Sequence, residues 1–197
     1  MTIDAKTVMQ LRQMTNAGLM DAKAALEETQ GNLEQAVEVL RKKGIAKAGK
    51  KAERETKEGR VYTYVHANGK MGSMVEVLCE TDFVARNELF EALCHDIAMH
   101  VAAADPLYVR REDVPGELIE KEREIYRGEM EGQAKPADII EKIIEGKLNK
   151  YFSEMCLLEQ LFVKDDSKTV QDLVKEKISS LGENIQITRF SRFQIGA

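Results

Sequence analysis

The stretch that decides the fold is RVYTYVHANGKMGSMVEVLCE, residues 60–80. It places an Asn-Gly pair, Asn68 and Gly69, between two runs of β-branched, aromatic and apolar residues, which is the strongest short signal for a β-hairpin. Two strands alone are marginally stable in water, so a third strand must join them. The clean alternation of residues 184–195 predicts that strand.

Three short helices are predicted ahead of the hairpin, because apolar residues recur there at helical spacing. Asp21 is a good N-cap for the second helix, and Asn32 with Gln35 forms a capping-box variant that starts the third. Gly31 and Gly44 are expected to end the second and third helices. This part of the chain therefore predicts a small helical bundle.

Leu19 and Met20 are large apolar residues expected on the loop between the first two helices. A bundle this small has little core, so it can spare few apolar groups for display. The expected display of these two side chains on a loop is therefore noteworthy. The alternative is that Met20 caps the weak core.

Helical spacing returns after the hairpin. A helix is expected from Asn87, and another over residues 167–181. Residues 115–131 and 139–151 are amphipathic and highly charged, with a polar break at residues 131–136 between them. Two such helices joined by a short turn should pack antiparallel, as a projecting arm.

These elements predict an α+β fold. The expected division is a three-helix head over residues 1–44, a basic linker over residues 45–59, and a core domain over residues 60–197. The core combines an antiparallel sheet with packed helices, and the antiparallel helix pair of residues 115–151 is inserted in it.

Composition places the chain among globular proteins, with 197 residues, 43% of them hydrophobic and 32% charged. No apolar run approaches the roughly 20 residues that cross a bilayer, and the N-terminal residues do not read as a secretory signal. Cys79, Cys94 and Cys156 are far apart, so neither a disulfide framework nor a zinc site is expected. We expect a cytoplasmic protein with no membrane contact.

A basic segment lies within a chain whose net charge is −5. Residues 41–60 hold nine Lys or Arg against three Glu, whereas the residues on either side are acidic overall. The expected explanation is a solvated linker helix. The alternative is an interaction module in which this segment binds RNA or a ribosomal surface, with a steep salt dependence.

Catalytic chemistry is poorly supported. His95 and His100 lie five residues apart on one predicted helix, about 140° around its axis, so they cannot converge on one metal ion. Cys94 has no third partner that would make it a nucleophile beside His95, and no phosphate-binding glycine motif occurs. We expect no enzyme activity, no catalytic residue, no metal and no cofactor. Loss of an activity on replacing Cys94 or His100 would revive the enzyme hypothesis.

Thr81, Asp82, Phe83 and Val84 form an unusual corner directly after the return strand. Thr81 is placed to cap the turn that follows, and a rigid corner is where proteins present side chains to partners. An aromatic residue beside a carboxylate is typical of an interaction hot spot. The alternative is that Phe83 folds inward and covers the hairpin.

Four stretches resemble the elongation factor Ts family, in the family's order. They are Val75–Asn87, which is similar to the family's core signature, Leu11–Leu26, which is similar to its N-terminal signature, Ile97–Pro106, and Pro136–Lys147. The resemblance implies a ubiquitin-associated-like head, a linker and a core with an antiparallel sheet. Because there is one hairpin and one such corner, the chain resembles the short form with a single core subdomain.

The resemblance implies a guanine nucleotide exchange factor for elongation factor Tu in translation elongation. Asp82 and Phe83, held by Thr81 and Val84, would act as a wedge near the magnesium ion of Tu and release GDP. No covalent step in this chain and no direct contact with nucleic acid are implied. Short members are expected to form homodimers that bind two Tu molecules, and the last strand, with Phe190 and Phe193, is suited to pairing at its edge.

Further contacts with Tu are implied for the head and the hairpin. Arg12, Leu19 and Met20 would dock on the G domain of Tu. His66 matches a family position that touches another domain of Tu. The helix pair resembles the family's helical arm, whose contribution to exchange is left open.

Overall fold

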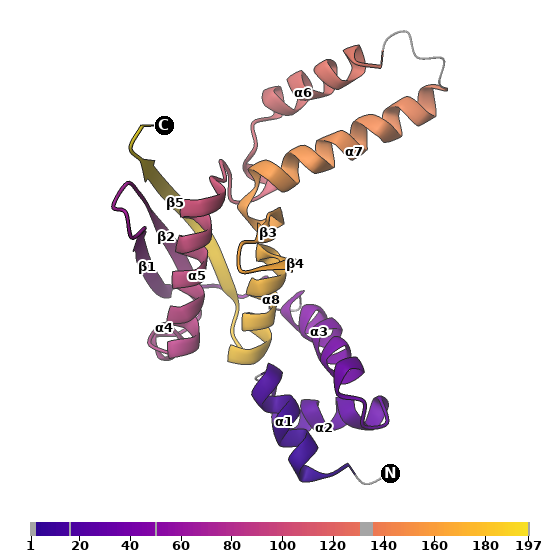
Figure 1. The fold of residues 1–197 in the computed structure, drawn as a ribbon, viewed down its shortest axis with the longest axis vertical. Coiled ribbons are helices and arrows are strands. Elements are labelled where there is room, and N and C mark those ends of the chain that lie inside the picture. Colours follow the sequence, from indigo (N-terminus) through magenta and orange to yellow (C-terminus); the bar gives the residue numbers. More distant parts are fainter. Residues whose placement is uncertain (1–2, 16, 50, 131–135, 197) are drawn as a thin grey trace. The chain divides into compact units, whose positions relative to one another are not determined.

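The computed structural model describes residues 3–15, 17–49, 51–130 and 136–196, and its fold is α+β (Figure 1). The helices are α1 Ala5–Thr15, α2 Leu19–Glu28, α3 Leu33–Gly49, α4 Asp82–Ala85, α5 Glu88–Ala104, α6 Gly116–Gly128, α7 Ala137–Met155 and α8 Val170–Leu181, with short 3-10 turns at Arg111–Asp113 and Leu157–Glu159. The strands are β1 Glu58–Val65, β2 Met71–Cys79, β3 Leu161–Phe162, β4 Asp165–Thr169 and β5 Ile185–Gln194.

The predicted hairpin is confirmed, and the last strand joins it. The sheet has the order β1-β2-β5, so β5 lies at an edge (Figure 1). Gly69 has a φ of +66°, which is the left-handed conformation that the Asn-Gly turn requires. At the turn the His66 N–H donates to Met71 O at 2.9 Å, and the Ile195 N–H donates to Lys70 O at 2.8 Å. The three strands therefore alternate in direction.

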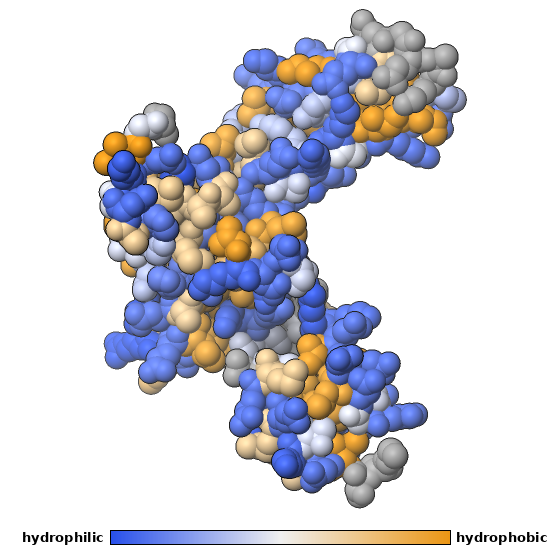
Figure 2. Space-filling model, in the orientation of Figure 1, coloured by the Kyte–Doolittle hydropathy of each residue, from blue (hydrophilic) through white to orange (hydrophobic). Residues whose placement is uncertain are grey.

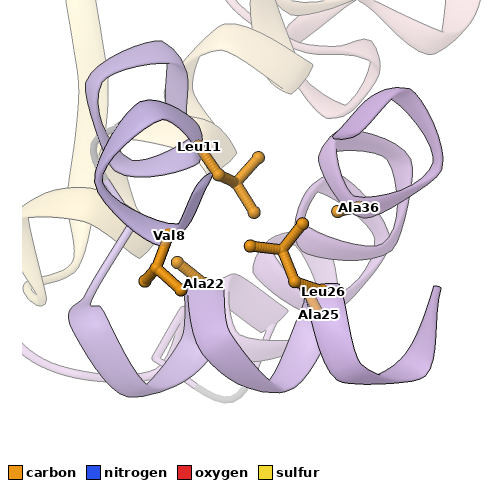
Figure 3. Packing of buried hydrophobic residues seen from close by; sticks show 6 residues of the cluster. All are labelled: Val8, Leu11, Ala22, Ala25, Leu26 and Ala36. Carbon is orange, nitrogen blue, oxygen red and sulfur yellow. The ribbon is translucent and has the colours of Figure 1, made fainter. Parts of the chain in front are cut away.

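The three predicted N-terminal helices are also confirmed, and they pack around a small apolar cluster (Figure 3). The buried residues of this cluster are Val8, Leu11, Ala22, Ala25, Leu26 and Ala36. Asn32 caps α3, since its side-chain oxygen accepts from the Gln35 N–H at 3.1 Å. Gly31, at a φ of +89°, closes the turn after α2.

Two predictions for this bundle are wrong. The N-cap of α2 is Gly18, so Leu19 and Met20 form its first turn and Asp21 is not its cap. Gly44 does not end α3, which continues to Gly49. A side chain at position 44 would place its Cβ 3.1 Å from Ser179 Oγ, so this glycine permits close packing against α8.

Helix α5 begins within one residue of the predicted start and lies against the sheet. Ser73 Oγ on β2 donates to Ala98 O at 2.5 Å, and the Tyr62 ring of β1 meets His95 edge-on. The buried apolar side chains of β2, α5, α8 and β5 are Val75, Val77, Cys79, Phe90, Leu93, Cys94, Ile97, Ala98, Val101, Ala102, Val170, Leu173, Val174, Ile178, Ile185 and Ile187.

The predicted helix pair is present as α6 and α7, which pack together (Figure 1). The predicted polar break at residues 131–136 lies outside the described residues except for Pro136, the N-cap of α7. Charged pairs such as Arg127–Glu141, at 3.0 Å, join the two helices. The face of this helix pair that Figure 2 shows is largely hydrophilic. At the base of the pair, Arg111 donates to Glu159 at 2.6 Å.

The predicted start of α8 at Ser167 is wrong. Residues 165–169 form β4, which pairs with β3 in a small two-stranded sheet that the sequence did not indicate, and α8 begins at Val170. The end of α8 is as predicted, because Gly182 adopts a φ of +83° and its N–H donates to Ile178 O.

The described residues fall into two compact units. One comprises Met1–Tyr62, Glu76–His95 and Asp172–Ile187, and the other comprises Thr63–Val75, Asp96–Gln171 and Thr188–Ala197. All of the contacts around residues 81–84 that are described next lie within the first unit.

Candidate functional site

The chain turns sharply between β2 and α5, at the corner formed by Thr81–Val84. Thr81 is the N-cap of α4, and its hydroxyl accepts from the Val84 N–H at 3.4 Å. Helix α4 is a single turn that closes with the Arg86 N–H on Asp82 O at 3.1 Å. The prediction that Thr81 caps this turn is confirmed, and the cap fixes the direction in which residues 82 and 83 leave the strand.

Glu183 braces the start of this corner from the loop before β5. One oxygen of its carboxylate accepts from the backbone N–H groups of Glu80, at 3.1 Å, and Thr81, at 3.0 Å. The other oxygen accepts from the Thr81 hydroxyl at 2.6 Å. Charge-assisted hydrogen bonds of this kind are roughly twice as strong as neutral ones.

Arg60 on β1 braces the other end of α4. Its Nε donates to Ala85 O at 2.6 Å, and its guanidinium pairs with Glu91 on α5 at 2.9 Å. The corner is therefore tied to the hairpin and to the helix that follows it. Ala85 is buried, which seats the end of the short helix in the core.

Phe83 points away from this braced backbone. Its side chain is 83% exposed, so the alternative in which it folds inward over the hairpin is wrong. Asp82 pairs with Arg86 at 3.1 Å on the surface, and Val84 is half-buried. An exposed aromatic side chain on a fixed turn is the arrangement expected of a contact residue.

The three cysteines have raised pKa values that make them unsuited to nucleophilic chemistry. Cys79 lies beneath the corner, and burial together with the Glu183 carboxylate raises the pKa of this thiol to about 11. Burial raises the pKa of Cys94 to about 12 and that of Cys156 to about 11. All three thiols are protonated at neutral pH, whereas nucleophilic cysteines need a lowered pKa.

His100 has a structural environment. It is fully buried; its Nε2 lies 2.9 Å from Gln160 Oε1, and its Nδ1 accepts from the Val163 N–H at 3.3 Å. The second bond leaves the proton on Nε2, so the neutral ring satisfies both partners. Burial lowers the pKa of His100. No group of three or more His, Cys, Asp or Glu side chains suited to a metal occurs among the described residues.

The head presents apolar side chains on its surface. Leu19 is 51% and Met20 is 74% exposed on the first turn of α2. Arg12 Nε on α1 donates to Ala17 O at 3.2 Å, next to the start of α2. Arg12 thus contacts the segment that leads into the first turn of α2, where Leu19 and Met20 lie.

His66 lies at the end of β1, beside the hairpin turn. It is exposed, and its Nδ1 lies 3.0 Å from the Tyr64 hydroxyl. It belongs to the second compact unit, whereas the corner belongs to the first. His66 is therefore available for contact but forms no part of the corner.

Several side chains of the basic segment form ion pairs within the chain while remaining partly exposed to solvent. Arg41 pairs with Asp172 at 3.4 Å and Arg54 with Glu80 at 3.5 Å. Lys51 donates to Gly182 O at 2.6 Å. Further ion pairs of this segment among the described residues are Arg41–Glu176, Lys43–Glu28, Lys57–Glu55 and Arg60–Glu91. This pairing reduces the positive charge that the segment offers to RNA.

Sequence reasoning missed Glu183 and Arg60. They lie on other elements, and Glu183 is 102 residues from Thr81 along the chain. A charged residue beside a strand carries no local pattern that reveals such a partner. Separately, none of the helices in the described part of the chain is long and apolar enough to cross a membrane.

The similarity to known proteins extends over almost the whole chain. The sequence model of the family described as "Elongation factor TS" matches residues 5–197. "Elongation factor Ts" of Geobacter sulfurreducens is 60% identical over 196 residues, covering 100% of this chain and 91% of that protein. The protein of the same name from Thermosipho melanesiensis is 58% identical, with 98% and 99% covered. The one from Fervidobacterium nodosum is 55% identical, with 100% of both chains covered.

A match of this extent leaves no part of the fold outside the family. It includes the head with Arg12, Leu19 and Met20 and the braced corner with Phe83. Since both the family model and several relatives above half identity span the chain, it belongs to the elongation factor Ts family.

Proposed function

We propose that this chain is the guanine nucleotide exchange factor of elongation factor Tu, and that it works in the cytoplasm. Family membership supports the partner, and the observation that carries the mechanism is the exposure of Phe83 on a turn braced from both ends. The chain would bind Tu with GDP and speed GDP release, so that GTP can enter. Nucleotide exchange involves no covalent step, so the chain would act as an exchange factor and not as an enzyme.

Phe83 and Asp82 would act as a wedge. Tu holds GDP through a phosphate loop and a bridging Mg²⁺, and Phe83 would pry apart the side chains that support that ion. Asp82 would compete for polar partners there after leaving Arg86, a surface pair that costs little to break. Without the magnesium bridge the β-phosphate charge is less compensated, and GDP dissociates faster.

The exchange must be reciprocal. If the chain weakens GDP binding to Tu by some factor, GDP weakens binding of the chain by the same factor. GTP that enters the emptied site can then expel the chain. This linkage makes the cycle run without any covalent chemistry.

The head would supply affinity. Leu19 and Met20 expose apolar surface on one turn of α2, with Arg12 beside them, which suits docking on the G domain of Tu. His66, exposed beside the hairpin turn, would touch another domain of Tu. These contacts would hold the partner while the corner acts.

The chain would form a homodimer that binds two Tu molecules. Strand β5 is at the edge of its sheet, and an edge strand can act as a template for a strand of another chain. Near its end, Phe193 and Ile195 are each 74% exposed. Burial of these side chains against a second copy would supply the apolar part of the interface.

The test is release of fluorescent GDP from purified Tu. Addition of the wild-type chain should accelerate release in proportion to its concentration until the rate saturates. A rate equal to that of Tu alone would overturn the proposed function. In that event RNA affinity would be measured at several salt concentrations, since a steep fall would favour the RNA-binding module.

A further inference from the structure

The carboxylate of Glu183 converges on the backbone that leads into the corner. It accepts from the Glu80 N–H, the Thr81 N–H and the Thr81 hydroxyl, all within 3.1 Å. None of these three donors belongs to the residue that would enter the partner. Glu183 therefore touches the support of Phe83 and leaves Phe83 itself exposed.

Glu183 is itself held from both sides. Before it, Gly182 O accepts from Lys51 Nζ at 2.6 Å. After it, the Asn184 side chain donates to Arg54 O at 2.8 Å, and the Asn184 N–H donates to Glu80 Oε1 at 2.6 Å. A carboxylate whose neighbours are fixed in this way is a rigid anchor.

The corner needs such an anchor. Helix α4 has four residues, and a helix this short is unstable by itself in water. Phe83 is 83% exposed, so packing against its own chain does little to fix its direction. The direction of the wedge is therefore set by the bonds at the two ends of α4, of which Glu183 supplies the first and Arg60 the second.

We propose that Glu183 is a positioning residue for nucleotide exchange, which fixes Thr81 so that Phe83 is presented in the orientation that opens the partner's magnesium site. This inference rests on the proposed function. A side chain that is already oriented loses less conformational entropy when it enters its partner. Removal of Glu183 should therefore slow the release of GDP that Phe83 brings about. Docking of the head uses other residues and should continue.

The experiment measures GDP release from Tu at increasing concentrations of the full chain. For Glu183→Ala the maximal rate should fall about tenfold, while the concentration for half-maximal rate changes less than about twofold. Glu183→Gln should restore most of the rate. Its amide oxygen still accepts from the two N–H groups, and the Thr81 hydroxyl can turn to accept from its NH₂. Glu159→Ala is the matched control, because it also removes a carboxylate that accepts a hydrogen bond, here from Arg111.

Two further variants keep the test decisive. If Glu183→Ala does not fold, Glu183→Asp keeps the charge but shortens the reach, and its maximal rate should fall in the same way. In a chain that already carries Phe83→Ala, replacing Glu183 should change the rate less than about twofold, because its effect passes through Phe83.

The outcomes separate the two proposals. If the wild type accelerates release and Glu183→Ala matches it, the positioning role is overturned and the exchange function stands. An equal loss from Glu183→Ala with and without Phe83 would also overturn it. If the wild type does not accelerate release at all, the exchange function itself fails, and the positioning role with it.

Discussion

Arg60 on β1 and Ala85 at the end of α4 are joined by a hydrogen bond of 2.6 Å, from the guanidinium Nε to the backbone carbonyl. The same guanidinium pairs with Glu91 on α5 at 2.9 Å. One side chain thus links the first strand of the hairpin to the corner and to the following helix. The consequence is a turn whose exposed phenylalanine stands on a backbone fixed by distant parts of the chain.

Met20 is predicted to contribute affinity and little to the maximal rate. It is 74% exposed on the head, so Met20→Ala removes apolar contact with Tu and leaves the corner intact. We expect the concentration for half-maximal GDP release to rise about tenfold, which corresponds to about 1.4 kcal/mol. Met14→Ala, at a 59% exposed methionine of α1, is the matched control. If the maximal rate fell and the concentration for half-maximal release stayed the same, Met20 would contribute to the rate and not to the affinity, which would contradict this prediction.

Gly59 is predicted to be essential for folding. Its φ is +150°, and a Cβ at this position would clash with the backbone oxygen of Val77 on the neighbouring strand. Gly59→Ala should therefore lower the free energy of unfolding by about 3 kcal/mol or more in urea denaturation. Gly146→Ala, in the interior of α7 with open space around it, should raise that free energy by up to about 1 kcal/mol. Equal effects of the two changes on the free energy of unfolding would refute the claim that the hairpin requires glycine at position 59.

His100 is predicted to make stability depend on pH. Burial lowers its pKa in the folded state, so the unfolded chain binds the proton more readily. The stability that the neutral ring contributes is present above pH of about 6.5 and is lost as the pH falls toward the folded pKa. The free energy of unfolding should fall by up to about 1.4 kcal/mol per pH unit from this group.

The check is chemical denaturation of the wild type and His100→Gln between pH 7.5 and 5.5. Glutamine can hydrogen bond but does not titrate, so the difference between the two curves isolates the histidine. The variant should show the shallower dependence. Parallel curves would mean that His100 takes no part in the acid sensitivity.

Phe193 is predicted to stabilise the homodimer. It is 74% exposed near the end of the edge strand β5, so Phe193→Lys should leave the fold intact and place a charge in the proposed interface. Sedimentation velocity should give a dimer for the wild type and a monomer for the variant. Val163→Lys, at another exposed apolar residue, is the control. A wild type that sediments as a monomer at every concentration tested would rule out the dimer.

The elements themselves were predictable where the signal is local. Asn68 and Gly69 specified the hairpin turn, and the alternation that ends in β5 specified the third strand. The helix that begins near Asn87 and the antiparallel helix pair followed from apolar spacing and are confirmed. In each case the residues that decide the element lie within it.

The errors arise where distant residues decide. Gly44 looked like a helix end, but its role is to admit Ser179 of α8. The ion pair of Arg41 was missed because its partner, Asp172, lies more than a hundred residues away along the chain. Glu183 was missed for the same reason. Strand β3 has only two residues, too few for alternation to reveal it.

The candidate site was predictable in its residues and only partly in its geometry. Thr81 as a cap follows from its residue type and position, and the structure confirms it. Chemistry alone left the direction of Phe83 open, because a large aromatic residue is commonly buried. The bonds of Glu183 and Arg60 to the backbone on either side of Phe83 join distant residues, so the sequence does not reveal them.

The most direct test of the central claim is the maximal rate of GDP release from elongation factor Tu, measured with the wild-type chain and with Phe83→Ala. Leu161→Ala, at an exposed leucine of β3, controls for loss of apolar surface, and thermal unfolding verifies that each variant is folded. The wedge mechanism predicts that Phe83→Ala loses most of the acceleration while Leu161→Ala keeps it. Full acceleration by a folded Phe83→Ala chain would contradict the mechanism.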